Sequence, residues 1–191
     1  MESIEGGEET QINEAYEKVM LWFFSYPDKE MSLNDLVEAV GIAKTTANRV
    51  VKELQEEGFL HIQTLGKLWR ISCNQQHTYN FSRKISYNLR QIYESGVLEL
   101  INEHYPQAKA VVLFGSYRKG DDTHESDIDI AVELIDNDPL ESIHLGNITQ
   151  FGYRENVPVQ IHLFSRNNID LNVFANIANG IVLQGFLEAR P

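Results

Sequence analysis

The sequence has little cysteine, a shortage of basic residues and no long apolar run, and each of these excludes a class of protein. The single cysteine, Cys73, cannot form an internal disulfide or a cysteine-based metal site, which fits a reducing cytoplasm. No apolar stretch approaches the length that spans a bilayer, so no membrane partner is expected. With 16 basic and 28 acidic residues the net charge is −12, which argues against indiscriminate binding to nucleic acid.

The chain is long enough, at 191 residues, for two small domains. Its first residues contain four glutamates and no basic residue, so they lack the composition of a signal or transit peptide. We expect a mobile acidic leader at 1–11, a first domain at 12–78, a connecting helix at 79–105 and a second domain at 106–191.

The first domain is predicted to contain three helices followed by a β-hairpin. Ser32 is a candidate N-cap, and Gly41 and Gly58 are candidate C-terminal stops. Apolar residues at helical spacing mark one buried face on each helix. The expected elements are helices at 12–26, 33–40 and 44–57 and strands at 59–64 and 68–72.

This order of elements resembles the winged helix-turn-helix domain of prokaryotic regulators. Residues 42–52 contain three basic residues and no acidic one, at the place where a DNA-reading helix is expected. The resemblance implies double-stranded DNA as a partner, although the same residues also fit the solvated face of an amphipathic helix. The candidate DNA-binding residues are Lys44, Thr45, Thr46, Asn48, Arg49 and Lys52 on the recognition helix and Lys67 and Arg70 on the wing.

A long helix is predicted at 82–104, with one apolar stripe that includes Leu89, Ile92, Val97 and Ile101. The stripe fits three partners equally well. They are the second domain, the winged helix, or the same helix of a second chain, which would make a homodimer suited to a palindromic DNA site.

The stretch at 110–134 carries the chemistry of the second domain. A short apolar run ends at Gly115-Ser116, and after ten residues Asp127 and Asp129 alternate with apolar residues. The period of two places both carboxylates on one strand face. Like charges side by side repel, and a hard cation such as Mg²⁺ or Mn²⁺ is the usual reason for such a pair.

The Gly-Ser turn and the Asp-x-Asp pair together resemble the signature of the polymerase-β nucleotidyltransferase superfamily, and most closely its small prokaryotic branch. The resemblance implies that Gly115 and Ser116 bind a nucleoside triphosphate and that Asp127 and Asp129 are the catalytic metal ligands. Arg118 and Lys119 follow the Gly-Ser turn and would neutralise phosphate charge, or would balance Asp121 and Asp122 at the surface.

The third strand, predicted at 158–164, departs from that superfamily. A third carboxylate usually faces the first two from this strand, and here the matching residue is Gln160. A neutral amide brings no negative charge and cannot act as a base near neutral pH. His162, two residues on, is a possible replacement for the base, and Asp170 or Glu155 are possible carboxylates from outside the strand.

The remaining segments complete an α+β fold. A helix is predicted at 140–152, a final helix at 168–179 and a last core segment at 181–183. The expected architecture is an N-terminal winged helix-turn-helix, a long connecting helix, and a C-terminal nucleotidyltransferase-like mixed sheet flanked by helices.

Two functions follow from these expectations. In one, the protein is a DNA-binding regulator whose nucleotidyltransferase-like domain binds Mg²⁺–nucleoside triphosphate with weak or lost transfer, because Gln160 replaces the third carboxylate. In the other, it is an active nucleotidyltransferase that modifies a hydroxyl of a protein, an RNA or a small molecule. Relatives of the small branch act on a toxin-type protein partner, as antitoxins.

Overall fold

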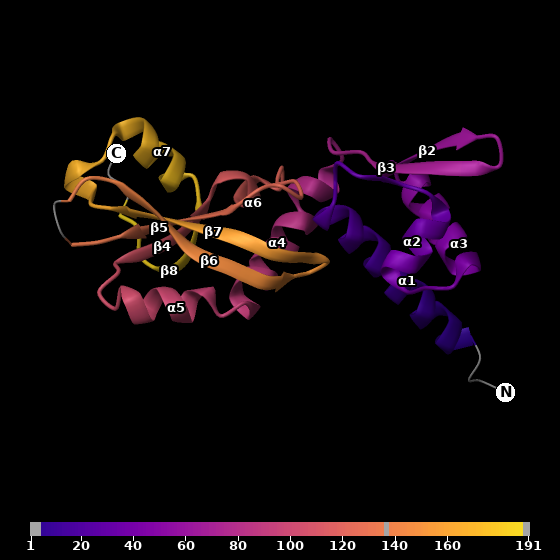
Figure 1. The fold of residues 1–191 in the computed structure, drawn as a ribbon, viewed down its shortest axis with the longest axis horizontal. Helices are drawn as coiled ribbons and strands as arrows, with labels where there is room; N and C mark the ends of the chain where they lie inside the picture. The colour runs from indigo at the N-terminus through magenta and orange to yellow at the C-terminus, as the bar shows by residue number, and fades with distance from the viewer. Residues whose placement is uncertain (1–4, 136–137, 189–191) are drawn as a thin grey trace. The chain divides into compact units, whose positions relative to one another are not determined.

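The chain divides into two compact units after Asn80, and each is described by itself. The structure, a computed structural model, describes residues 5–135 and 138–188 (Figure 1). Within that part of the chain, no helix is long and apolar enough to cross a membrane.

The N-terminal unit has the predicted order of three helices and a hairpin. A short strand, β1, was not predicted and joins the hairpin in an antiparallel sheet of order β1-β3-β2. The elements are α1 (Glu5–Ser25), β1 (Glu30–Met31), α2 (Leu33–Val40), α3 (Lys44–Glu56), β2 (Leu60–Leu65), β3 (Leu68–Cys73) and the 3₁₀ turn η1 (Thr78–Phe81).

Local signals explain most of these boundaries. The Ser32 hydroxyl accepts a hydrogen bond from the Asp35 backbone N–H, as expected of an N-cap, and Gly41 ends α2 in the left-handed conformation. Side chains from the three helices, among them Phe23, Leu36 and Leu54, are fully buried in one core. The first helix begins at Glu5, so the expected start at residue 12 is wrong, because the helix continues into the acidic segment.

The C-terminal unit contains a five-stranded mixed sheet of order β6-β7-β5-β4-β8, in which β5 and β7 are parallel. All other neighbouring strands are antiparallel. The elements are α4 (Arg83–Glu94), α5 (Val97–His104), β4 (Ala110–Phe114), α6 (Gly115–Lys119), β5 (Ile128–Glu133), β6 (Glu141–Phe151), β7 (Arg154–Phe164), η2 (Arg166–Asn168), α7 (Leu171–Ala178) and β8 (Ile181–Gly185).

The predicted long connecting helix is wrong: it is two helices, α4 and α5, separated at Ser95-Gly96. Gly96 has a φ of +79°, a left-handed conformation that turns the chain. Ile92, Val97 and Ile101 lie in the core under the sheet. Of the three partners that the stripe fitted, the structure therefore shows the second domain.

The predicted helix at 140–152 is also wrong, because this segment is the edge strand β6, paired with β7 over most of its length. The register shifts at Gly146, which lies at a β-bulge with a φ of +143°. A bulge moves the alternation of side chains by one residue, so the apolar spacing of β6 imitates a helix rather than a period of two.

The two faces of the sheet have different coverings. Helices α4 and α5 contribute to the core on one face, and α7 covers part of the other (Figure 1). Under α7 lie Ala110, Val112, Ala131 and Phe164, which pack with Ile177 of the helix. The rest of this second face, towards the start of β5, is where the polar candidate residues lie.

Candidate nucleotide site and candidate DNA interface

The Gly-Ser turn and Asp129 are brought together at the end of β4. Gly115 follows directly after β4 and has a φ of +70°. A Cβ atom at this position would lie 2.5 Å from Asp129 Oδ2, which no ordinary contact allows. Glycine is therefore needed both for the turn and for the close approach of the carboxylate, and it links the two halves of the motif.

The alternation in β5 is confirmed. Ile128 and Ile130 are fully buried, while Asp129 is half-buried, as is Asp127 directly before the strand. Asp129 pairs with Phe114 of β4 on one side and with Gln160 of β7 on the other. Ser116 is half-buried in the first turn of α6, beside Gly115.

Gln160 lies directly beside Asp129, at the register expected of the third carboxylate. In residues 5–135 and 138–188, no group of three His, Cys, Asp or Glu side chains is arranged to hold a metal ion. The two carboxylates that remain, on Asp127 and Asp129, would suit one Mg²⁺ that arrives with a nucleotide, because Mg²⁺ is commonly held by one or two carboxylates together with phosphates and water.

His162 contacts the candidate site directly. Its Nε2 lies 3.1 Å from Asp129 Oδ1, and its Nδ1 lies 2.9 Å from the Ser142 hydroxyl of β6. The ring packs edge-on against Phe114, with the centroids 5.0 Å apart. Ser142 was missed by the sequence reasoning, because its segment was expected to be a helix.

Asp170 and Glu155, the two carboxylates considered as replacements for the third acid, have other surroundings. Asp170 is the N-cap of α7, where its Oδ1 accepts from the backbone N–H groups of Asn172 and Val173. Glu155 is exposed on β7 and pairs with Gln150 of the edge strand.

A buried polar network holds the loop that connects α6 to Asp127. The Lys84 ammonium of α4 lies 3.2 Å from Asp122 Oδ2 and donates to the backbone carbonyl of Asp122. The Asn88 amide donates to Asp122 Oδ1 and to the Tyr117 carbonyl, at 2.8 and 3.1 Å. Asp122 is thus buried, not a surface partner of Arg118 and Lys119. Burial raises the pKa of its carboxyl, while Lys84 and Asn88 act in the opposite direction.

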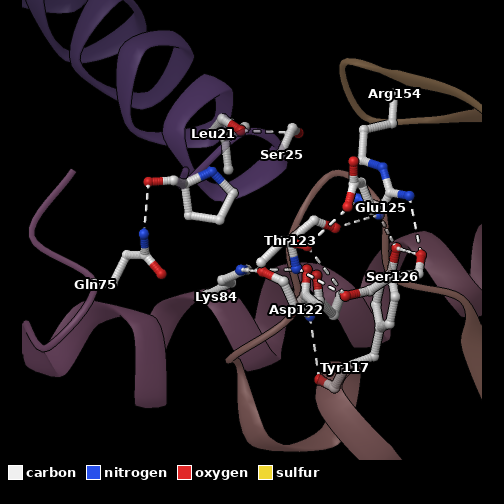
Figure 2. Close-up of polar contacts among 12 residues, drawn as sticks. Leu21, Ser25, Gln75, Lys84, Tyr117, Asp122, Thr123, Glu125, Ser126 and Arg154 are labelled. Carbon is white, nitrogen blue, oxygen red and sulfur yellow. Dashed lines mark hydrogen bonds and ion pairs between the residues drawn. The ribbon is translucent and has the colours of Figure 1, made fainter. Parts of the chain in front are cut away.

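Arg154, at the start of β7, holds the other end of this loop (Figure 2). Its guanidinium donates to the Tyr117 hydroxyl and to the carbonyls of Thr123 and Ser126. The Ser126 hydroxyl in turn accepts from the Thr123 N–H at 2.9 Å. Burial raises the pKa of the Tyr117 hydroxyl. Sequence reasoning missed this network because Lys84 and Arg154 are distant along the chain and belong to no motif.

The two cations after the Gly-Ser turn differ in exposure. Lys119 is exposed at the end of α6, whereas Arg118 is half-buried, and its Nε is a buried atom without a hydrogen-bond acceptor among the described residues. Both follow Ser116 within one short helix.

The candidate DNA-binding residues lie on α3 and on the hairpin. The Lys52 ammonium lies 5.7 Å from the centre of the Trp69 ring, and Arg70 pairs with Glu30 at 2.6 Å. A hollow of about 290 Å³ between α2, α3 and the hairpin is lined by Lys44, Asn48 and Lys67, among others. The exposed candidates are Lys44, Thr45, Arg49, Lys52, Lys67 and Arg70, and the half-buried ones are Thr46 and Asn48.

Comparison with protein families agrees with this division of the chain. Residues 97–185, from the start of α5 to the end of β8, match the family described as Polymerase beta, Nucleotidyltransferase. Residues 21–63 match the IclR helix-turn-helix domain. A comparison with curated proteins found no significant match. The chain therefore joins an N-terminal helix-turn-helix domain of the IclR type to a C-terminal nucleotidyltransferase domain of the polymerase beta family.

Proposed function

We propose that this protein is a DNA-binding regulator whose C-terminal domain binds a Mg²⁺–nucleoside triphosphate and transfers its nucleotidyl group weakly. The observation that carries the proposal is the pairing of Gln160 with Asp129. A neutral amide stands where the family's third carboxylate would stand, beside an otherwise intact Gly-Ser and Asp-x-Asp pair.

The retained residues support nucleotide binding. Gly115 leaves space for the Asp129 carboxylate, and Ser116 follows it beside the same strand end. Asp127 and Asp129 would hold Mg²⁺, which neutralises charge on the phosphates when bound. Lys119 is exposed nearby in sequence and would contribute positive charge towards the phosphates.

The substituted residue supports slow transfer. Gln160 can accept or donate a hydrogen bond, but it can neither take a proton near neutral pH nor add a negative ligand for a second cation. A site of this kind retains affinity for its nucleotide while the attack of an acceptor hydroxyl becomes inefficient.

The first domain supports a role on DNA. Exposed cations lie on α3 and on the hairpin of a chain whose net charge is −12. Cations confined to these elements would bind phosphate only where the recognition helix fits the duplex, which favours a specific site over indiscriminate binding.

The test combines two assays on one preparation. A fluorescent nucleoside triphosphate is titrated with and without Mg²⁺, and an α-labelled nucleotide is used to follow transfer to protein or RNA. We expect Mg²⁺-dependent binding and little multiple-turnover transfer to an external acceptor. Failure to bind any nucleoside triphosphate would overturn the nucleotide half, and salt-insensitive or absent binding to duplex DNA upstream of its own gene would overturn the regulator half.

A second candidate function is an active nucleotidyltransferase with an unconventional base. The observation in its favour is His162, which contacts Asp129 and a hydroxyl at the same time. Rapid, multiple-turnover transfer to an external hydroxyl in the same assay would select this candidate over the weak one.

A further inference from the structure

Three side chains from neighbouring strands form one hydrogen-bonded line across the open face of the sheet. Ser142 of β6 lies directly opposite His162 of β7, with 2.9 Å between Oγ and Nδ1. His162 reaches over to Asp129 of β5, with 3.1 Å between Nε2 and Oδ1. The line therefore runs from an exposed hydroxyl to a carboxylate of the candidate nucleotide site.

The contacts of the two ring nitrogens fit one tautomer of the histidine. With its proton on Nε2, the ring donates to the Asp129 carboxylate, which can only accept when it is ionised. The unprotonated Nδ1 is then the acceptor for the Ser142 hydroxyl. A hydroxyl that donates to a histidine oriented by a carboxylate is the arrangement that activates a nucleophile.

The order of strands places this hydroxyl at the edge of the nucleotide site. Moving across the sheet, Gly115 and Ser116 follow β4, Asp129 lies on β5, Gln160 and His162 lie on β7, and Ser142 lies on β6. Ser142 is exposed, whereas the side chains of Asp129 and His162 are 30% and 21% exposed. If a triphosphate is held at Asp127 and Asp129, the Ser142 hydroxyl would thus lie on the same side of it as Gln160.

We propose that Ser142 is a nucleotidyl acceptor within the same chain, so that the protein modifies itself with a nucleoside monophosphate. This inference rests on the proposed nucleotide binding and adds the acceptor. The Ser142 Oγ attacks the α-phosphorus, and an Oγ–P bond forms. The bond from the α-phosphorus to the bridging oxygen breaks, and pyrophosphate leaves with the electron pair. The hydroxyl proton passes to His162 Nδ1 and from there to water.

Self-modification suits a site that has lost its third carboxylate. An acceptor that is already in place avoids the entropic cost of aligning a second molecule, so a well-aligned intramolecular reaction is much faster than its bimolecular counterpart. One slow event per chain is enough for a regulator, whereas an enzyme that modifies many external acceptors needs rapid turnover.

The experiment uses the full chain with an α-labelled nucleoside triphosphate and Mg²⁺. Labelled protein is detected after denaturing electrophoresis, and the modified peptide is identified by mass spectrometry. We expect wild type to gain one nucleoside monophosphate on Ser142. Ser142→Ala should lose the label while its affinity for a fluorescent nucleotide stays unchanged, and His162→Gln should label about 100-fold more slowly.

Thr149→Val is the matched control, because Thr149 is another exposed hydroxyl of β6. It should label like wild type. Nucleotide binding without label on wild type, or label that persists in Ser142→Ala, would overturn the inference and leave the proposed nucleotide binding intact. Absence of nucleotide binding in wild type would overturn both, so the two failures are distinguishable.

Discussion

At the scale of single residues, the candidate site is defined by one residue that keeps the family pattern, Gly115, and one that departs from it, Gln160. Gly115 has no side chain because a carboxylate occupies the space that its Cβ would need. Gln160 has no charge although it stands beside Asp129. The first of these keeps the nucleotide site intact and the second limits what the site can do, so each leads to a separate substitution test.

Gly115→Ala should destabilise the protein and weaken nucleotide binding. The left-handed conformation alone costs an alanine about 1–2 kcal/mol, and the contact with Asp129 Oδ2 adds to this. Gly96→Ala is the matched control, because Gly96 has a similar φ of +79° but nothing within 4 Å of its added Cβ. Urea unfolding and nucleotide titration measure both effects. Equal losses of stability in the two variants would show that the close approach to Asp129 is unimportant.

Gln160→Asp should raise nucleotidyl transfer. It places an anionic group beside Asp129, and general-base catalysis is typically worth about 10²–10⁴-fold. The gain will be smaller if the shorter side chain misplaces the acceptor. Gln160→Asn is the control for side-chain length. Single-turnover transfer of an α-labelled nucleotide is the measurement, and robust transfer by wild type that Gln160→Asp leaves unchanged would contradict the idea of a degenerate site.

At the scale of elements, helix α4 supports the candidate nucleotide site and helix α3 carries the candidate DNA-binding residues. Helix α4 precedes the stretch that matches the polymerase beta family, yet its Lys84 and Asn88 hold the loop before Asp127. Helix α3 presents cations to solvent while Val50, Val51 and Leu54 bury its other face. Helix α4 therefore acts through the loop that it holds, whereas α3 has one face in the core and one face in solvent.

Lys84→Met should destabilise the C-terminal unit by about 3–5 kcal/mol, because it leaves the buried Asp122 carboxylate without its cation. Adding Asp122→Asn should recover much of the loss. Arg90→Met, which breaks an exposed pair with Glu94 on the same helix, should cost only about 0.3–0.5 kcal/mol. Chemical denaturation measures all three, and similar losses for Lys84→Met and Arg90→Met would refute the structural role of the buried pair.

The loss of stability in Lys84→Met should depend on pH in a defined direction. Burial already raises the pKa of Asp122, and removing the ammonium that opposes this raises it further. When the pKa of a carboxyl is higher in the folded protein than in the unfolded chain, folding favours its protonated form. The free energy of unfolding of the protein therefore falls as pH rises through the folded-state pKa. The difference from wild type should therefore shrink as pH is lowered towards about 4, the ordinary pKa of an aspartate.

Arg49→Ala with Lys52→Ala should weaken duplex binding and make its salt dependence shallower. Each lost phosphate contact lowers the slope of log affinity against log salt by about 0.9. Both residues are exposed on α3. Lys18→Ala, which removes a cation paired with Glu14 on α1, is the control and should leave the slope unchanged. Fluorescence anisotropy at several salt concentrations measures the slopes, and identical slopes in wild type and the double variant would exclude α3 as the phosphate-binding element.

At the scale of the whole molecule, the chain separates a region expected to read DNA from a region expected to bind a nucleotide. Both tryptophans, Trp22 and Trp69, belong to the first unit, whereas Asp127 and Asp129 belong to the second. Intrinsic tryptophan fluorescence therefore reports on the first unit, and circular dichroism reports on both.

Mg²⁺ with a nucleoside triphosphate should raise the Tm of the second unit. A ligand at 100 times its Kd stabilises by about 2.7 kcal/mol. Asp127→Asn with Asp129→Asn should abolish this shift, while the ligand-free variant is at least as stable as wild type, because repulsion is relieved and asparagine can still accept from His162. A ligand-free variant that melts well below wild type in circular dichroism would mean that the pair is structural.

Much of the fold and of the candidate site was determined by the sequence alone, because its signals are local. Ser32 and Gly41 specify the ends of α2 through hydrogen bonds and a left-handed turn within a few residues. The alternation of Asp127, Ile128 and Asp129 specifies which side chains are buried without reference to any other strand. These patterns carried both family resemblances and, together with them, were sufficient to predict the hairpin and to place Gln160 on the third strand.

Only the tertiary structure decided what depends on partners distant along the chain. Edge strand β6 is a strand because β7 supplies its hydrogen bonds, although its bulged apolar pattern favours a helix. The buried partner of Lys84 is 38 residues away, and the line from Ser142 through His162 to Asp129 exists because three strands pair in one register. Which distant segments form hydrogen bonds with one another depends on how their surfaces pack, and local sequence patterns do not specify that packing.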